Sequence, residues 1–374
     1  MQVDDQQQVL AVGNSDPPPQ SIDLGNVALL PGLVNAHTHL EFSDCEQPIG
    51  TPGMELASWI GHVVSQRGAA TQKQKLDAIE LGLRESMNSG TCLIGEICTP
   101  PLQYPTGNQQ PQVYCFAEVL GLSRERYQER MDASYQQFET RPTSTGWSPH
   151  APYSTNPQAV QWCIDRAIQH NQAIAMHVAE SPAERELIAD GSGPFRVALE
   201  SLGAWRPDLF PRGDNSIESL IQQLAQAPRA LLVHGNDLQG TEIDLIAEHQ
   251  NLTVVFCPRT HAFFGHDRHP IDRLLHQGIR VALGTDSRAS NPDLNLWREV
   301  QHVLNHRPDI APSCALAMAT LNGADAIGVQ SLGKIRPGTN AIFGMVRTEA
   351  STLDQVYADL ACNDYVPVAG TRTD

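Results

Sequence analysis

The sequence predicts an α/β fold, a (β/α)8 TIM-type barrel, from three observations. Eight short apolar runs alternate with helical patterns from Leu33 onward. The runs are apolar throughout, as expected for parallel strands whose two faces are both covered. The chain has 374 residues, enough for a barrel of about 250 residues and a small second unit.

Each expected element has its own pattern. Buried strands are expected over residues 33–39, 91–96, 112–118, 146–150, 173–178, 230–234, 252–257 and 280–284. Helices are expected over residues 74–88, 125–138, 157–170, 182–189, 216–226, 242–249 and 271–277, and after the last strand over 293–303 and 312–321. Residues 191–214 are rich in Gly and Pro and predict an enlarged loop after the fifth strand.

The two ends of the chain lack the strand–helix alternation of the middle. Short strand patterns occur at residues 9–12, 22–24 and 341–346, and Gly333-Lys334 interrupts the barrel pattern. We therefore expect a small, reduced β-sandwich-like accessory domain built from both termini. Its expected limits are residues 1–30 plus 335–374, with the barrel over residues 31–334.

Composition excludes several classes of function. The formal charge is -17 and Lys and Arg form no cluster, so a nucleic-acid partner is not expected. No run of about 18 apolar residues occurs, so no membrane span is expected. The eight cysteines are scattered without a Cys-x-x-Cys pair, which predicts reduced thiols in a cytoplasmic protein. Helical patterns over 55–64 and 293–303 are candidate contacts for a homodimer.

The segment His37-Thr38-His39 is the main sequence indication of a functional site. Side chains at i and i+2 of a strand face the same side, so both imidazoles can reach one metal ion. Alone, the pair is equally compatible with two polar residues that close a buried strand.

Four further strand ends carry His or Asp. They are His150, His177, His234 and Asp286. Carboxyl ends of barrel strands meet at one face, where buried polar groups need partners. We expect His37, His39, His177 and Asp286 to bind one divalent metal ion.

Three imidazoles and a carboxylate suit Zn²⁺, with Fe²⁺ as the alternative. Related barrel hydrolases with two metals often bridge them by a carboxylated lysine. None of the three lysines, Lys73, Lys75 and Lys334, lies at a strand end, so a single metal is predicted.

Glu180 lies three residues after His177 and could shuttle protons beside a metal-bound water. The alternative is an acid at a helix N-terminus ahead of Ser181-Pro182. His234 could orient the water or the substrate, or be a core histidine. His150 could contact the substrate or bond within its loop.

Several segments together resemble the amidohydrolase superfamily, in its cytosine deaminase-like, adenosyl- and aminofutalosine-deaminase-like and chlorohydrolase branch. The similar segments follow the family's order across residues 30–340. They are residues 31–39, 148–153, 177–181, 233–235, 284–287 and 319–324.

The resemblance implies a hydrolytic deaminase that acts on an aminated N-heterocycle, a purine or pyrimidine base or a nucleoside-like compound. Metal-bound hydroxide would be the nucleophile. Asp286 would take the proton of the water, Glu180 would protonate a ring nitrogen, and His234 would help to hold the hydroxide.

One segment departs from the family pattern. Many relatives read Cys-Pro-x-Ser-Asn after strand seven, whereas this chain has Cys-Pro-Arg-Thr-His-Ala-Phe-Phe from Cys257. This form is similar to an aminofutalosine deaminase-like group. Arg259 and His261 could bind an anionic or hydroxyl-rich substrate, and Arg259 could equally form a structural ion pair.

The same residues are compatible with two other functions. The same site could release chloride or an alkylamine, or open a cyclic amide. A barrel that keeps metal without catalysis is of another class, and it would need neither Glu180 nor His234.

Overall fold

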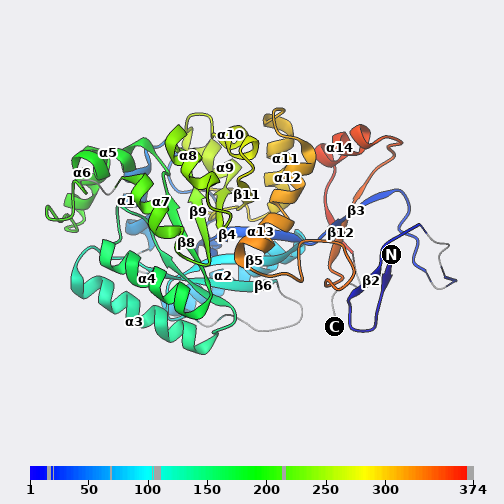
Figure 1. Ribbon diagram of the computed structural model, residues 1–374, viewed down its shortest axis with the longest axis horizontal. Coiled ribbons are helices and arrows are strands. Elements are labelled where there is room, and N and C mark those ends of the chain that lie inside the picture. The colour runs from blue at the N-terminus through cyan, green and yellow to red at the C-terminus, as the bar shows by residue number, and fades with distance from the viewer. Residues whose placement is uncertain are drawn as a thin grey trace.

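A computed structural model describes residues 1–14, 18–19, 21–67, 70–102, 104, 111–212 and 216–368. Eight parallel strands form one sheet in chain order (Figure 1). They are β4 (Leu33–Thr38), β5 (Thr91–Cys98), β6 (Gln112–Val119), β7 (Thr145–Pro149), β8 (Ala173–Val178), β9 (Arg229–His234), β10 (Leu252–Phe256) and β11 (Arg280–Leu283).

The first and last strands approach each other and nearly close the sheet. The backbone N–H of Asp286 donates to the carbonyl of His37 at 3.1 Å. The side chain of Asn35 donates to Thr285 Oγ1 at 2.8 Å. The predicted (β/α)8 barrel is thus confirmed.

Helices surround the barrel (Figure 1). They are η1 (Leu40–Phe42), α1 (Leu56–Arg67), α2 (Gln72–Asn88), α3 (Arg124–Thr140), α4 (Pro157–His170), α5 (Pro182–Asp190), α6 (Gly193–Ser201), α7 (Ile217–Leu224), α8 (Gly240–Ala247), α9 (Pro258–Phe264), α10 (Ile271–His276), α11 (Leu296–His306), α12 (Pro312–Met318), α13 (Leu321–Ile327) and α14 (Leu353–Cys362). Helix α4 begins where Asn156 caps it and Pro157 fits the first turn.

Strand alternation sorts side chains between the barrel interior and the helical layer. On β8, Ala173 and Ala175 pack with Phe116 of β6 in one cluster. Ile174 and Met176 instead pack with helix residues in the large outer core. His177 continues the inward row, which directs its side chain into the mouth of the barrel.

The terminal segments form two small sheets. Strands β1 (Gln2–Val3) and β2 (Val9–Ala11) pair antiparallel. Strand β12 (Phe343–Arg347) lies between β3 (Val27–Pro31) and β13 (Val366–Pro367). The strand expected over 22–24 does not form, and the pairing starts at Val27 instead. The limits of the accessory domain stay a prediction.

The expected loop over 191–214 was wrong in part, because α6 lies within it. Pro194 fits the first turn of this helix, and Phe195 and Leu199 bury its apolar side. Residues 213–214 lie outside the described residues.

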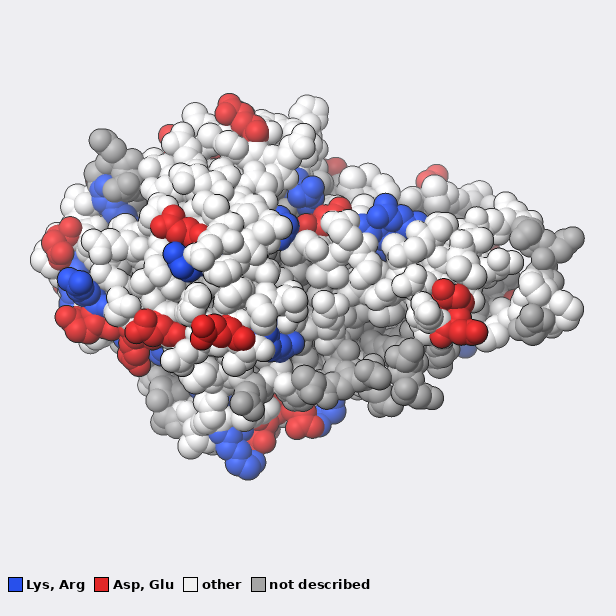
Figure 2. All heavy atoms as spheres, turned by 60° about the horizontal axis from the view of Figure 1, so that its bottom comes forward, with Lys and Arg blue, Asp and Glu red and all other residues white. Residues whose placement is uncertain are grey.

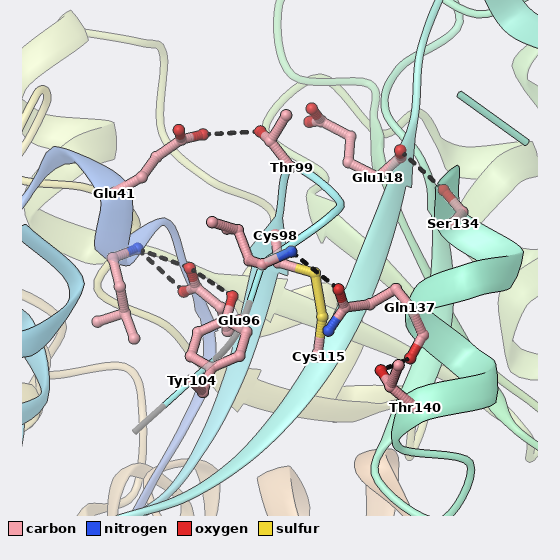
Figure 3. The surroundings of a disulfide bond; sticks show 12 residues. Glu41, Glu96, Cys98, Thr99, Tyr104, Cys115, Glu118, Ser134, Gln137 and Thr140 are labelled. Atoms are coloured by element: carbon pink, nitrogen blue, oxygen red, sulfur yellow. Dashed lines mark hydrogen bonds between the residues drawn. A yellow bond between two sulfur atoms is a disulfide. The ribbon is translucent and has the colours of Figure 1, made fainter. Parts of the chain in front are cut away.

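The expectation of reduced cysteines was wrong for Cys98 and Cys115, which form a disulfide (Figure 3). They lie on the neighbouring strands β5 and β6, with Cα atoms 6.0 Å apart. Two cysteines 17 residues apart on two different strands match no short spacing motif. Cys163, Cys257, Cys314 and Cys362 are free thiols.

The helices and the molecular surface were compared with the expected absence of membrane and nucleic-acid partners and with the expected homodimer. Among the described residues, no helix is both long enough and apolar enough to cross a membrane. On the face shown in Figure 2, acidic and basic side chains are interspersed. Helices α1 and α11, the candidate homodimer contacts, pack within the chain against α6 and α14 respectively.

Candidate metal centre

Three predicted ligands meet at the mouth of the barrel. Each of His37, His39 and His177 offers a ring nitrogen, and these three atoms lie within 4.8 Å of one another. His37 and His39 come from β4 and its end, and His177 comes from β8. Two distant parts of the chain thus supply one cluster, as the strand-end argument predicted.

Asp286 joins this cluster. Its Oδ1 lies 3.6 Å from Nε2 of His37 and 3.8 Å from Nε2 of His39. The N–H of Ser287 donates to the same oxygen at 2.8 Å, and the hydroxyl of Ser290 donates to Oδ2 at 2.9 Å. These donors stabilise the carboxylate and orient it toward the imidazoles.

The donor set fits a metal ion. Both ring nitrogens of His37 are buried and have no hydrogen-bond partner among the described residues, a costly arrangement unless a ligand completes it. Nδ1 of His177 lies 2.7 Å from the carbonyl of His150, which leaves Nε2 facing the cluster. Burial lowers the pKa of all three imidazoles, so each is neutral and able to coordinate.

Glu180 and His234 lie beside this cluster as a pair. Oε1 of Glu180 is 3.4 Å from Nε2 of His234, and both side chains are buried. Burial raises the pKa of Glu180 well above its ordinary value, and Asp286 and Glu184 raise it further. A carboxyl group in this setting favours its protonated form and can donate a proton.

A buried acid missed by the sequence reasoning holds the loop that carries Glu180. Glu184 accepts the N–H of Ala179 at 2.7 Å, and burial raises its pKa to about 8. Asn236 donates to the carbonyl of Glu180 at 3.0 Å. Ser181 followed three residues later by Glu184 is a helix-start pattern that could have indicated this acid.

A cavity of about 500 Å³ opens over the cluster. Helices α1 and α6 contribute a largely apolar wall that includes Trp59 and Phe195. His150 also lines the cavity, and its Nδ1 lies 2.6 Å from Oγ of Ser154. The site combines a polar floor with room for a drug-sized ligand.

Arg259 and His261 do not line this cavity. Arg259 pairs with Glu299 and Asp293, each at 2.6 Å. Nε2 of His261 lies 2.9 Å from the carbonyl of Asp267. Arg259 therefore forms a structural ion pair, which was the alternative to substrate binding. Substrate contact by Arg259 and His261 stays a prediction.

Two carboxylates missed by the sequence reasoning do line the cavity, Glu41 and Glu118. Glu41 follows the His-x-His pair by two residues, and Glu118 lies near the end of β6. The rule that selected His150 and His177 as strand-end residues also applies to Glu118.

Comparisons with known proteins show which sequences this chain is similar to. The amidohydrolase family model matches residues 28–366. A 5-methylthioadenosine/S-adenosylhomocysteine deaminase of Nitratidesulfovibrio vulgaris is 28% identical over 90% of this chain and 75% of that protein. An aminodeoxyfutalosine deaminase of Nitratiruptor sp. is 28% identical over 86% of this chain and 79% of that protein.

Solved structures agree on the fold. Helicobacter pylori aminofutalosine deaminase in complex with methylthio-coformycin superposes with a TM-score of 0.77. It is 22% identical, over 93% of this chain and 87% of that one. The match to the family model spans nearly the whole chain, from strand β3 to strand β13, and this chain belongs to the amidohydrolase family.

Proposed function

We propose that this protein is a metal-dependent hydrolytic deaminase of an aminated N-heterocycle in a nucleoside-like compound. The observation that carries the proposal is the buried Glu180–His234 pair beside the imidazole–aspartate cluster, in one cavity. A site that only binds metal needs neither residue. Family membership and the deaminases at 28% identity support hydrolysis of a carbon–nitrogen bond.

One divalent metal ion, Zn²⁺ with Fe²⁺ as the alternative, would be held by His37, His39, His177 and Asp286. When bound, it would supply Lewis acidity and lower the pKa of a water toward about 7. The neutral, buried imidazoles and the oriented carboxylate support this assignment.

The protein's own groups would then move the protons. The carboxylate of Asp286 accepts a proton from the attacking water. The protonated carboxyl of Glu180 donates a proton to the ring nitrogen beside the carbon under attack, and its raised pKa favours this role. Nε2 of His234, 3.4 Å from Glu180 Oε1, orients the water. The proton held by Asp286 then passes to the amino group, the bond from the ring carbon to that nitrogen breaks, and ammonia leaves. The proton of the new hydroxyl returns to Glu180 as the carbonyl forms. His150 binds the substrate from the cavity wall.

The test is ammonia release from a panel of aminated purines, pyrimidines and nucleosides by the Zn²⁺-loaded protein. Glu180→Gln should lower the rate by roughly 10²–10⁴-fold. The matched control is Glu186→Gln, because Glu186 is an exposed residue of the same helix α5. Ammonia from no compound, or a Glu180→Gln variant within tenfold of wild type, would refute the proposal.

The same assay separates the alternatives. Chloride, alkylamine or ring-opened product from the corresponding analogues would identify a different leaving group. Tight binding of compounds without turnover would identify a non-catalytic metal-bearing barrel.

Location and assembly are further proposals. We propose the cytoplasm, supported by the buried free thiols Cys163 and Cys257. We also propose a homodimer, formed through the exposed residues of helices α1 and α11. Alkylation of thiols at cell lysis, followed by mass spectrometry, tests whether the Cys98–Cys115 disulfide is present in cells. Light scattering tests the dimer.

A further inference from the structure

Glu118 stands at the mouth of the barrel in a position that the proposed mechanism does not use. On β6, Tyr114 and Phe116 pack in the cluster that includes Ala175 and Val233. Side chains at i, i+2 and i+4 of a strand share one face. Glu118 therefore follows Tyr114 and Phe116 on the inward face, where it lines the same cavity as Glu180.

The carboxyl group of Glu118 faces the cavity and not a donor among the residues that the structure describes. The residue is 8% exposed. Within the described part of the chain no hydrogen bond or ion pair reaches its side chain, whereas its backbone carbonyl accepts from Ser134. Figure 3 shows its carboxyl group directed away from Ser134 and toward the side where Thr99 and Glu41 lie.

The neighbouring carboxylates differ from Glu118 because the protein satisfies them. Glu41 accepts the hydroxyl of Thr99 at 2.8 Å and pairs with Lys75 at 2.8 Å. Glu96 accepts the N–H of Leu40 at 2.9 Å. Among these three, Glu118 is the acceptor left open toward the cavity.

The charges around Glu118 do not offset its burial. Burial raises the pKa of its carboxyl, the charge of Glu41 raises it too, and Arg130 and Lys75 lower it, which leaves a net value of about 8. A buried carboxylate that lacks a donor is costly to keep, and a ligand that brings a donor would relieve that cost.

We propose that Glu118 binds a hydrogen-bond donor on the substituent of the substrate's heterocycle, a hydroxyl or an ammonium group, and excludes a carboxylate there. The inference rests on the proposed function, because Glu180 at the same cavity fixes where the reacting ring lies. Substrate selection would then come from charge at Glu118 as well as from the apolar wall.

Two arginines of the cavity wall are engaged with their own neighbours. Arg126 is 47% exposed and pairs with Glu129 at 3.2 Å. Arg206 donates to the carbonyl of Trp205 at 2.8 Å. Neither bonds to Glu118, so neither supplies the donor that its carboxylate lacks.

The experiment uses the Zn²⁺-loaded protein and four 6-aminopurine nucleosides at pH 9, above the pKa of about 8, so that Glu118 is ionised. One is the unmodified nucleoside, one lacks the 2′ and 3′ hydroxyls, one carries a 5′-amine, and one carries a 5′-carboxylate. Glu118→Gln removes the charge but keeps an amide acceptor, whereas Glu118→Leu removes both. Glu125→Gln, at an exposed residue of α3, is the matched control.

Wild type should have its lowest kcat/KM on the carboxylate compound. If an ammonium group meets Glu118, both variants lose at least tenfold on the 5′-amine compound. If hydroxyls meet it, Glu118→Leu loses at least tenfold on the unmodified nucleoside and little on the compound without hydroxyls. In either case the carboxylate compound should improve in Glu118→Gln.

An equal loss on all four compounds, or changes below twofold on all of them, would overturn the inference. If wild type releases no ammonia from any compound, the proposed function fails by itself. The affinities of the same compounds for wild type and both variants, measured by calorimetry, would then decide the role of Glu118. Urea unfolding of each variant excludes loss of fold as the cause.

Discussion

The unpartnered carboxylate of Glu118 should make the protein less stable as pH rises, and Glu118→Gln should remove this effect. Burial raises its pKa from 4.5 to about 8 in the folded chain. Between these values the folded state binds a proton at Glu118 that the unfolded state has released. Folding stability is therefore lost across this window as pH increases.

The size of the loss follows from the two pKa values. They differ by about 3.5, which at about 1.4 kcal/mol for each pH unit corresponds to ~5 kcal/mol over the whole window. Glutamine keeps the shape of the side chain and cannot ionise. Since no described residue forms a hydrogen bond to this side chain, the substitution itself should cost little.

Urea unfolding of wild type and Glu118→Gln at pH 5, 6.5 and 8 measures the effect. The stability of the variant relative to wild type should rise by roughly 4 kcal/mol from pH 5 to pH 8. Taking the difference between the two proteins cancels the other titrating groups they share. A relative stability that stays constant within about 1 kcal/mol would show that Glu118 titrates near its ordinary value and would refute the reasoning.

Three further predictions concern the rest of the site. Removal of metal by a chelator should abolish ammonia release and lower stability by about 3 kcal/mol or more, judged against a protein reloaded with one equivalent of Zn²⁺; full activity without metal would contradict the assigned ligands. Arg259→Met should cost about 3–5 kcal/mol in urea unfolding, because it leaves Glu299 buried without its cation, and should leave KM nearly unchanged. A large rise in KM with unaltered stability would restore Arg259 as a substrate contact. Glu184→Gln should lower kcat by about 10²-fold with little change in KM, because an amide offers one acceptor oxygen where the two oxygens of Glu184 accept the N–H groups of Ala179 and Glu180; an unchanged kcat would show that the loop holds its position without the second acceptor.

The barrel was predictable from sequence because each strand is a separate apolar run. The strand expected over 173–178 has the same limits as β8, and the one expected over 252–257 ends one residue after β10. Local patterns failed where tertiary contacts decide the structure. The composition of residues 191–214 indicates a loop, but packing of Phe195 and Leu199 stabilises helix α6.

The site could be predicted where a residue type that commonly binds metal, such as histidine, lies at the end of a strand. The positions of His37 and His177 follow from alternation and barrel geometry alone. Glu118 also lies at the end of a strand, but sequence alone does not single it out, because a glutamate at this position is usually a solvated surface residue. Arg259 shows the opposite case: a charged residue in a functional segment whose partners, Glu299 and Asp293, are more than 30 positions away in sequence.

Glu180 and His234 are the residues that alternation alone would misplace. His177 and Val233 face inward, so Glu180, three positions after His177, and His234, next to Val233, should both face the outer helices. They reach the site because the backbone turns just there, with φ of 52° at Ala179 and 71° at His234. Non-glycine residues adopt this left-handed region at a cost of about 1–2 kcal/mol each.

The fold holds both turns from outside the site. Glu184 accepts the N–H of Ala179 at 2.7 Å, and Nε2 of His269 lies 2.8 Å from the carbonyl of His234. Asp286 has the same backbone conformation, with φ of 56°, and its N–H is held by His37. Strained residues persist where their surroundings over-determine them. The groups that we propose to transfer protons are therefore oriented by turns that sequence periodicity does not encode, and their positions depend on residues such as Glu184 and His269 that do not line the cavity.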